Sequence, residues 1–188
     1  IFLNKIKKKK NNFFQKEFFF YPANFWEHKN HKNLLLGFQK FNKNNKYNLI
    51  LTGDTINNKY YIEIKKFIEK KKITNTKILG FVSQNKLINL YDQSLGLIYP
   101  SYSGPENIPP LESFARGKPV AISNYIGAKE QLKNNAFYFN PNSIRNISNG
   151  FRYLIQNSKK KKLRQKLKHF AKLNISKNYL KTILRNLK

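Results

Sequence analysis

The sequence predicts an α/β domain with a doubly wound parallel sheet and a helical C-terminal tail. Short apolar runs alternate with longer stretches whose apolar residues recur at helical spacing, which is the pattern of strands joined by crossover helices. After residue 143 only the helical pattern remains. We expect residues 1–16 to be a linker or the end of a preceding element, 17–158 to form a Rossmann-like domain, and 159–188 to form C-terminal helices.

The expected strands are short apolar runs bounded by turn residues or charged stretches. Residues 17–21, EFFFY, form a continuous apolar run that is typical of a strand covered on both faces, and Pro22 ends it. Runs of the same kind recur along the chain. The expected strands are residues 17–21, 47–53, 77–81, 96–100, 120–123 and 136–139.

The expected helices are stretches in which apolar residues recur every three or four positions. The first begins near His31 or Lys32, and its buried side carries Leu34, Leu35, Phe38 and Phe41. Ser83 is a suitable N-cap for a later one. Further helices are expected at residues 57–72, 84–93, 129–132, 144–155, 160–173 and 179–187.

The segment 104–117, GPENIPPLESFARG, joins two strands through a loop and another helix. Pro109 and Pro110 suit a first helical turn, because proline lacks a backbone N–H and its φ is already helical. Gly117 is placed to end that helix in the left-handed conformation. Helix N-termini at the carboxyl edge of a parallel sheet favour anions. The backbone N–H groups of Glu106, Asn107 and Ile108 are therefore candidates to face a phosphate.

Glu112, expected in the first turn of this helix, is a candidate to accept hydrogen bonds from ribose hydroxyls. The alternative is that its carboxylate only complements the helix dipole. Spacing alone leaves both open.

The composition excludes several kinds of site. There is no cysteine, and therefore no disulfide, thiolate metal site or cysteine nucleophile. No apolar run approaches the roughly 20 residues of a membrane-spanning helix, and the opening residues lack the order of a signal peptide. The chain begins with Ile and has no Met, so we expect it to be a piece of a longer protein.

The net charge of +28 invites a nucleic-acid partner. However, Lys and Asn are used heavily throughout, and the lysines are spread over helix faces rather than gathered with aromatics on one module. This bias is typical of an AT-rich genome and favours a solvated surface, so we expect no nucleic-acid partner. An anionic membrane surface is the next candidate for this charge.

The stretch GPENIPPLESFARGKPVAISN resembles the donor-binding segment of the retaining GT-B glycosyltransferases of family 4. In that family two glutamates bracket a loop that ends in PPLEA, and the second binds the ribose of a nucleotide sugar. Glu112 matches the second glutamate, whereas Gly104 stands at the position of the first, which contacts the transferred sugar. A subgroup with GPxNxPPLEAFA at this place also lacks the first glutamate.

The loop after the first strand also resembles this family, whose arginine and lysine hold the donor pyrophosphate there. Lys29 matches the lysine, and Asn24 stands at the position of the arginine. Without the resemblance Lys29 would be one more solvated lysine. His28 and His31 are spaced as a metal pair, but zinc sites need three or four ligands and no third is close in sequence.

The resemblance extends to two further places. In the family the loop equivalent to Gly80–Val82 stacks on the nucleobase and bonds it through main-chain groups, so Phe81 and Val82 are donor-site candidates. Simple strand-to-helix packing is the alternative at this loop. Glu130 matches a glutamate that is common in the family at the start of a later helix.

The resemblance implies the donor-binding half of a retaining glycosyltransferase, inactive without its other domain, that serves cell-surface polysaccharide or glycolipid synthesis. Lys29 would be its catalytic group, no metal or cofactor would be required, and the sequence has no Asp-x-Asp motif. The partners would be a nucleotide-sugar, a glycan or lipid-linked acceptor, the missing first domain of the protein and an anionic membrane surface. The location would be cytoplasmic or peripheral at the inner membrane face. The alternatives are a non-catalytic nucleotide-binding remnant and a basic nucleic-acid or membrane-surface protein.

Overall fold

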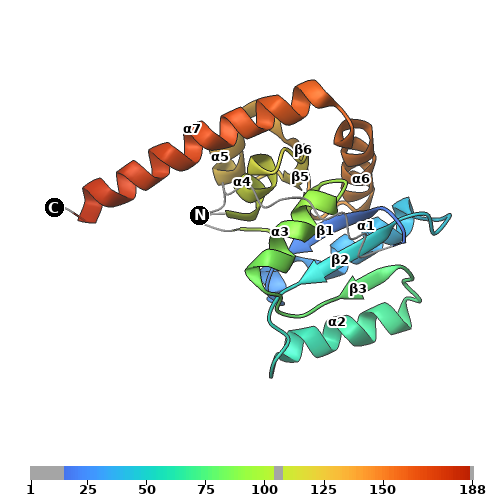
Figure 1. Ribbon diagram of the computed structural model, residues 1–188. Coiled ribbons are helices and arrows are strands. Elements are labelled where there is room, and N and C mark those ends of the chain that lie inside the picture. The colour runs from blue at the N-terminus through green and yellow to red at the C-terminus, as the bar shows by residue number, and fades with distance from the viewer. Residues whose placement is uncertain (1–14, 104–107, 187–188) are drawn as a thin grey trace.

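The protein is a parallel α/β sandwich with one long helix at its C-terminal end (Figure 1). The computed structural model describes the backbone of residues 15–103 and 108–186, and the side chains of the same residues except 126 and 175–186. The strands are β1 (Phe18–Pro22), β2 (Asn48–Thr52), β3 (Thr76–Ile78), β4 (Leu97–Tyr99), β5 (Val120–Ser123) and β6 (Phe137–Phe139). The helices are α1 (His31–Phe41), α2 (Lys59–Lys70), α3 (Gln84–Gln93), α4 (Ile108–Ala115), α5 (Ile126–Leu132), α6 (Ile144–Ser158) and α7 (Lys161–Asn186), with short 3-10 turns η1 (Glu27–Lys29) and η2 (Lys133–Asn135).

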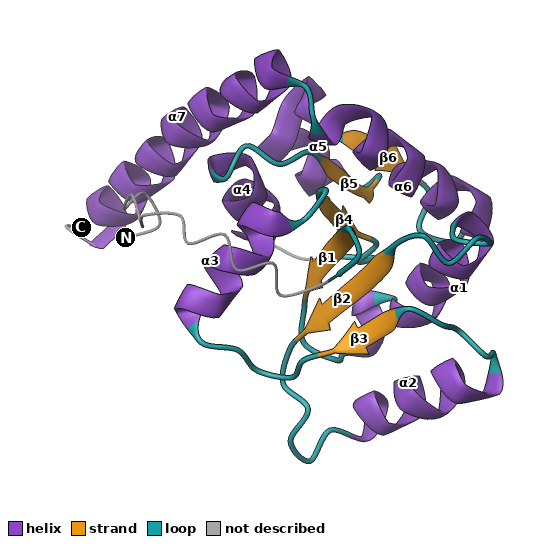
Figure 2. Cartoon of the chain, turned by 45° about the vertical axis from the view of Figure 1, so that its right-hand side comes forward, coloured by secondary structure: helices purple, strands orange, loops and turns teal. Residues whose placement is uncertain are grey.

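All strand pairings are parallel, and the order across the sheet is β3-β2-β1-β4-β5-β6. This is the strand order of a Rossmann fold, so the doubly wound sheet expected from the sequence is confirmed. Helices α1, α2 and α6 lie on one side of the sheet, and α3 and α4 lie on the other (Figure 2). The order reverses between β1 and β4, and we call this place the switch point.

The core is centred on β1, whose four aromatic residues are almost wholly buried. Phe19 packs edge-on against Phe151 of α6 on one face, and Phe20 packs edge-on against Tyr91 of α3 on the other. Successive side chains of a strand point to opposite faces. The uninterrupted apolar run is therefore explained by helices on both sides.

Several expected boundaries are wrong. Helix α5 begins at Ile126 instead of residue 129, and α6 ends at Ser158 instead of residue 155. The third strand ends at Ile78 instead of residue 81, because Gly80 takes a left-handed φ of 67° and turns the chain outward. Phe81 is consequently 86% exposed. The two helices expected at 160–173 and 179–187 are one continuous helix, α7. The sequence between them, NISKN, contains neither Gly nor Pro, so no residue there stops a helix.

Candidate functional site

A cavity of about 540 Å³ lies at the carboxyl edge of the sheet, at the switch point. The loops after β1 and β2, the end of β4 and the starts of α3 and α4 surround it. It is lined by Pro22, Ala23, Asn24, Trp26, Lys29, Thr52, Gly53, Phe81, Val82, Leu87, Tyr99, Ile108 and Pro109. We call it the switch-point cavity. Open α/β sheets bind ligands at this place.

The loop after β1 is fixed to the loop after β4 by hydrogen bonds. Asn30, in a left-handed conformation, donates from its side chain to the carbonyls of Pro100 (3.1 Å) and Pro141 (2.9 Å). The amide of Tyr102 donates to the carbonyl of His28 at 2.9 Å. These bonds cross the switch point, so the wall of the cavity that carries Lys29 is held by both halves of the sheet.

Lys29 lies at the end of η1, and two tyrosines hold it. The hydroxyl of Tyr21 donates to the Lys29 carbonyl at 2.7 Å. The Lys29 ammonium lies 5.6 Å from the centre of the Tyr99 ring and donates to the Tyr99 hydroxyl at 3.4 Å. Burial lowers the pKa of Lys29, since a desolvated ammonium is less stable than a solvated one.

Asn24 lies on the same wall, but its side chain helps to shape the loop. Its Oδ1 accepts a hydrogen bond from the amide of Asp54 at 3.1 Å, which ties the loop after β1 to the loop after β2. The two loops are in close contact at Gly53, where a Cβ atom would lie 2.3 Å from the carbonyl oxygen of Ala23. A carboxamide carries no charge, so among the described residues that line the cavity Lys29 alone supplies positive charge.

Three large apolar side chains on the cavity remain open to solvent. Trp26 is 52% exposed, Ile108 is 57% exposed, and Phe81 is the most exposed of the three. Apolar exposure gathered around a hollow with one central cation is typical of a small-molecule site. Phe81 can offer its ring to a planar group.

Helix α4 begins at Ile108, so Pro109 and Pro110 lie in its first turn as expected. It ends in a Schellman motif, in which the amide of Gly117 (φ 70°) bonds the Phe114 carbonyl at 2.8 Å and that of Lys118 bonds the Ser113 carbonyl at 2.9 Å. The left-handed glycine predicted for the end of this helix is confirmed.

Glu112 lies in the second turn of α4, not in the first turn, because the helix already includes Ile108. Its Oε2 accepts a hydrogen bond from the Tyr91 hydroxyl at 2.7 Å. Burial raises the pKa of Glu112, and the bond from Tyr91 opposes that shift by stabilising the carboxylate. A position in the second turn weakens the alternative that Glu112 only complements the dipole, which acts within the first turn.

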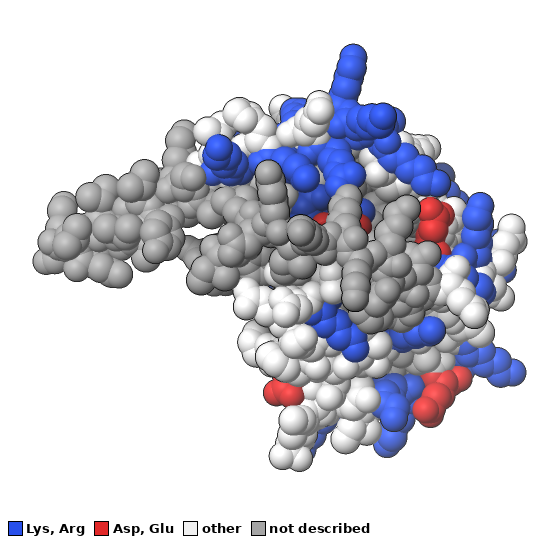
Figure 3. Space-filling view, in the orientation of Figure 1, with Lys and Arg blue, Asp and Glu red and all other residues white. Residues whose placement is uncertain are grey.

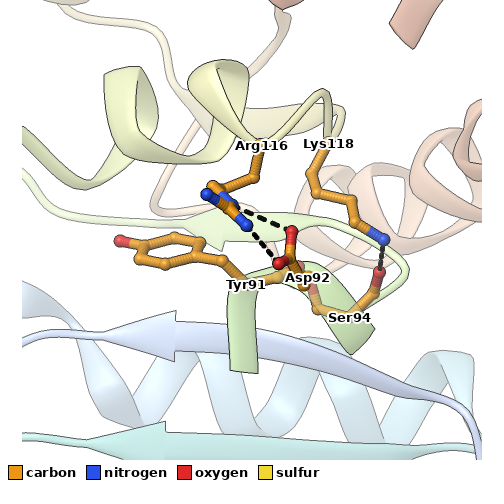
Figure 4. A network of polar contacts seen from close by, with 5 residues as sticks. All are labelled: Tyr91, Asp92, Ser94, Arg116 and Lys118. Atoms are coloured by element: carbon orange, nitrogen blue, oxygen red, sulfur yellow. Dashed lines mark hydrogen bonds and ion pairs between the residues drawn. The ribbon is translucent and has the colours of Figure 1, made fainter. Parts of the chain in front are cut away.

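Polar contacts join the C-terminal ends of α3 and α4 (Figure 4). The Arg116 guanidinium forms a bidentate ion pair with Asp92, in which Arg116 Nε donates to Asp92 Oδ1 at 2.9 Å. The Lys118 ammonium donates to the carbonyl of Ser94 at 2.8 Å. Since Asp92 follows Tyr91, this pair fixes the separation of the two helices across which Tyr91 reaches Glu112.

The structure brings most of the sequence-predicted site residues together. Asn24, Lys29, Phe81, Val82 and Ile108 line the switch-point cavity. Glu112 is not one of its lining residues and lies one turn farther along α4. Glu106 and Asn107 lie outside the described residues.

Sequence reasoning missed two residues of the site, Trp26 and Tyr99. Both line the cavity. The signal for Tyr99 was its place as the last residue of the strand before the 104–117 segment. Trp26 is the chain's only tryptophan, and it precedes Lys29 in a polar loop. A large apolar side chain at such a place is not needed to fill the hydrophobic core.

The two histidines have different surroundings. His28 is exposed, whereas His31 is buried and stacked on Phe25 with ring centres 4.6 Å apart. Burial lowers the pKa of His31 to about 3. Among the described side chains, no three His, Asp or Glu groups lie close enough to hold a metal ion.

A second hollow of about 600 Å³ lies at the opposite edge of the sheet, between the end of α1 and the loop after α2. Lys40, Lys43 and Lys72 are among its lining residues. None of the predicted site residues that the structure describes lines it, so the switch-point cavity is the stronger candidate.

Comparisons with known proteins identify a family. The family model described as "Glycosyl transferases group 1" matches residues 4–174. The O-antigen chain mannosyltransferase RfbU of Salmonella typhimurium is 32% identical over 145 residues, which cover 70% of this chain and 38% of that protein.

Solved structures share the fold. A glycosyltransferase from Rickettsia africae aligns with a TM-score of 0.76 and 24% identity over 86% of this chain and 44% of its own. Sucrose-phosphate synthase from Thermosynechococcus elongatus aligns with a TM-score of 0.76 and 14% identity, covering 93% of this chain and 47% of the synthase. The chain thus spans less than half the length of these relatives. With the match to the family model over most of its length, the chain belongs to the group 1 glycosyl transferases.

Proposed function

We propose that this chain is the donor-binding half of a retaining glycosyltransferase and binds a nucleotide-activated sugar in the switch-point cavity. The observation that carries the proposal is the position of Lys29, the cation among the lining residues, between exposed apolar groups at the switch point. Family membership supports the reaction class. The similarity to a mannosyltransferase of O-antigen chains supports a role in cell-surface polysaccharide or glycolipid synthesis.

Different residues would contact different parts of the donor. Lys29 would stabilise the negative charge that develops on the departing diphosphate, and such stabilisation is commonly the largest catalytic contribution. Phe81 and Val82 would hold the nucleobase, and the backbone at the start of α4 would face a phosphate. Pro109 and Pro110 have no N–H and the Leu111 N–H already lies inside the helical hydrogen-bond ladder, so at the described start of α4 the amide of Ile108 would serve.

Glu112 would bind the ribose. Its bond to Tyr91 occupies Oε2 and leaves Oε1 to accept a hydrogen bond from a ribose hydroxyl. The proposal needs no protein nucleophile and no metal. The acceptor, a glycan or a lipid-linked sugar, would bind with the help of the rest of the protein, so we propose that this chain alone binds donor without transferring sugar.

Titration calorimetry of this chain with UDP, GDP and ADP at moderate salt tests the proposal. We expect one diphosphate to bind selectively, and Lys29→Ala to weaken it about 10-fold or more through loss of a charge-assisted contact. Glu112→Ala should weaken the ribonucleotide but not its 2′,3′-dideoxy analogue. Lys66→Ala, on the exposed face of α2, is the matched control and should bind normally. Binding that falls steeply with salt and ignores both Lys29 and Glu112 would overturn the proposal.

A second proposal concerns the location of the protein. Exposed basic residues gather over the first half of α7 and the turn before it (Figure 3). They are Lys159, Lys160, Lys161, Lys162, Arg164, Lys166, Lys168 and Lys172. We call them the α7 basic surface. No helix in the described part of the chain is long and apolar enough to cross a bilayer. The charge supports a peripheral position on an anionic membrane, which we propose to be the inner face of the cell membrane.

A further inference from the structure

The main chain around Lys29 is fixed before any ligand binds. Its amide bonds the Trp26 carbonyl at 3.0 Å, and its carbonyl accepts the hydroxyl of buried Tyr21. The preceding residue, His28, is bonded through its carbonyl to both Ser101 and Tyr102. The Cα–Cβ direction of Lys29 is therefore set by residues on both sides of the switch point.

The side chain of Lys29 is fixed as well, and Tyr99 is the residue that fixes it. The ammonium is within cation–π range of the Tyr99 ring and at hydrogen-bond distance from its hydroxyl. Tyr99 itself is rigid: it is 3% exposed, ends the central strand β4, and packs edge-on against Tyr21 at 5.4 Å. A long flexible side chain thus has a buried aromatic support.

We propose that Tyr99 is a positioning residue that holds the Lys29 ammonium in the switch-point cavity, ready for a diphosphate. This inference rests on the proposed function, in which Lys29 binds the donor diphosphate. Asn24 lines the same cavity but carries no charge. A lysine that is already held in position can bind the diphosphate without a second cation from that residue.

A neutral aromatic partner suits this task better than an acidic one. A carboxylate would hold the ammonium through an ion pair, and an incoming phosphate would have to break that pair. Burial raises the pKa of Tyr99 well above its ordinary value, so the hydroxyl stays protonated and uncharged. Lys29 therefore keeps its full charge for the ligand and loses little rotamer freedom when the ligand binds.

A double-mutant cycle with calorimetry tests the inference. The ligands are UDP and UMP, with the GDP/GMP and ADP/AMP pairs run alongside, and the readout is the preference for diphosphate over monophosphate. We expect Tyr99→Phe, which keeps the ring, to reduce this preference roughly 3-fold, and Tyr99→Leu to reduce it roughly 10-fold. In a Lys29→Ala background both changes should cost less than about 2-fold.

The matched control is Tyr138→Phe, which removes a hydroxyl that bonds the carbonyl of Lys133 on the far edge of the sheet. It should leave the preference unchanged, and thermal unfolding checks that every variant is folded. If Tyr99→Phe and Tyr99→Leu cost as much without Lys29 as with it, Tyr99 only packs the core and the inference fails while the proposed function stands. If the unmodified chain shows no preference for any diphosphate, the proposed function fails and the inference fails with it.

Discussion

At the scale of single residues, His31, the first residue of α1, is a polar side chain enclosed in an aromatic part of the core. The imidazole is stacked on Phe25, lies close to Tyr21 and Tyr60, and is wholly buried. Its Nδ1 and Nε2 have no hydrogen-bond partner among the described residues. Desolvation, followed by the nearby Lys29 charge, disfavours protonation of this ring.

We expect His31 to make the fold sensitive to acid. Its folded pKa of about 3 lies below its unfolded value of 6.5, so the unfolded chain takes up the proton first and stability falls as pH falls through this interval. At about 1.4 kcal/mol per unit, lowering the pH from 7.5 to 5 should cost about 2 kcal/mol through this residue.

Urea unfolding of the unmodified chain and of His31→Phe at both pH values measures this contribution. The phenyl ring keeps the stacking and removes two buried unsatisfied nitrogens, so it should add roughly 1–3 kcal/mol at neutral pH and abolish that part of the acid sensitivity. An equal loss on acidification in both proteins would contradict the expectation. The comparison variant is His28→Phe. Burial and the Lys29 charge also lower the pKa of this exposed residue, but by less than at His31, so this change should alter the pH dependence of unfolding much less than His31→Phe does.

Residue roles of this kind could be predicted only where a motif carried them. Lys29 and Phe81 were found from the resemblance, and the structure places both on one cavity. Glu112 was already a candidate from its place in the 104–117 segment, and the resemblance added its match to the family's second glutamate. The contact between Lys29 and Tyr99 joins residues 70 positions apart, and no local pattern reports it. His31 was open to interpretation as a metal ligand because sequence does not show that aromatic rings enclose it.

At the scale of elements, α4 is the helix whose geometry the site needs most. Its N-terminal end borders the switch-point cavity, its second turn carries Glu112, and its C-terminal end is joined to α3 through Arg116. Helix α7 packs along it, with Phe114 edge-on against Phe170 at 5.9 Å. The Schellman turn at Gly117 is the point where α4 ends against α7.

We expect Gly117→Ala to destabilise the protein by about 2 kcal/mol or more. A left-handed φ costs a non-glycine residue roughly 1–2 kcal/mol, and the added Cβ would lie 2.5 Å from Cγ of Arg164 and 3.2 Å from its carbonyl oxygen. Thermal or urea unfolding measures the loss. Gly127→Ala, in helix α5, is the matched control: its φ is not left-handed, and the added Cβ would meet only the Tyr125 ring, at 3.3 Å, so that substitution should cost much less than Gly117→Ala. Equal stability of the two variants would show that the turn tolerates a side chain.

The order and type of the elements followed from the sequence pattern, because β1, β2, β4 and β5 are apolar runs buried on two faces and most helices have one apolar stripe. The sequence pattern did not predict where β3 ends, nor that α7 is one continuous helix. A left-handed glycine is not distinguishable by sequence from a glycine within a strand, and the polar stretch between the two expected helices of α7 is compatible with either a loop or a helix.

At the scale of the whole molecule, the charge of +28 is the property most open to a direct test. We expect vesicles with about 30% anionic lipid to bind the chain at low salt and to release it at high salt, since the attraction is screened within a Debye length. Replacing Lys161, Lys162 and Lys166 by Gln should weaken binding roughly 100-fold, at about 1 kcal/mol for each lysine near the surface.

Sedimentation with vesicles gives the measurement. The control is the same charge change on α2, with Lys65, Lys66 and Lys70 replaced by Gln, which lies at the other end of the molecule in Figure 1 and should have a much smaller effect. Equal weakening by both triple variants would mean that net charge, and not the α7 basic surface, determines binding.

The switch point also has a consequence for the order in which the chain assembles. Strands β3, β2 and β1 are consecutive neighbours, as are β4, β5 and β6, so each half can form from short-range connections. The pairing of Phe20 with Leu97 closes the longest loop in the sheet, and such closures are slow. If the two halves meet late, a nucleotide bound across their junction would act mainly after the barrier to folding. It would then lengthen the lifetime of the native protein far more than it would speed its formation.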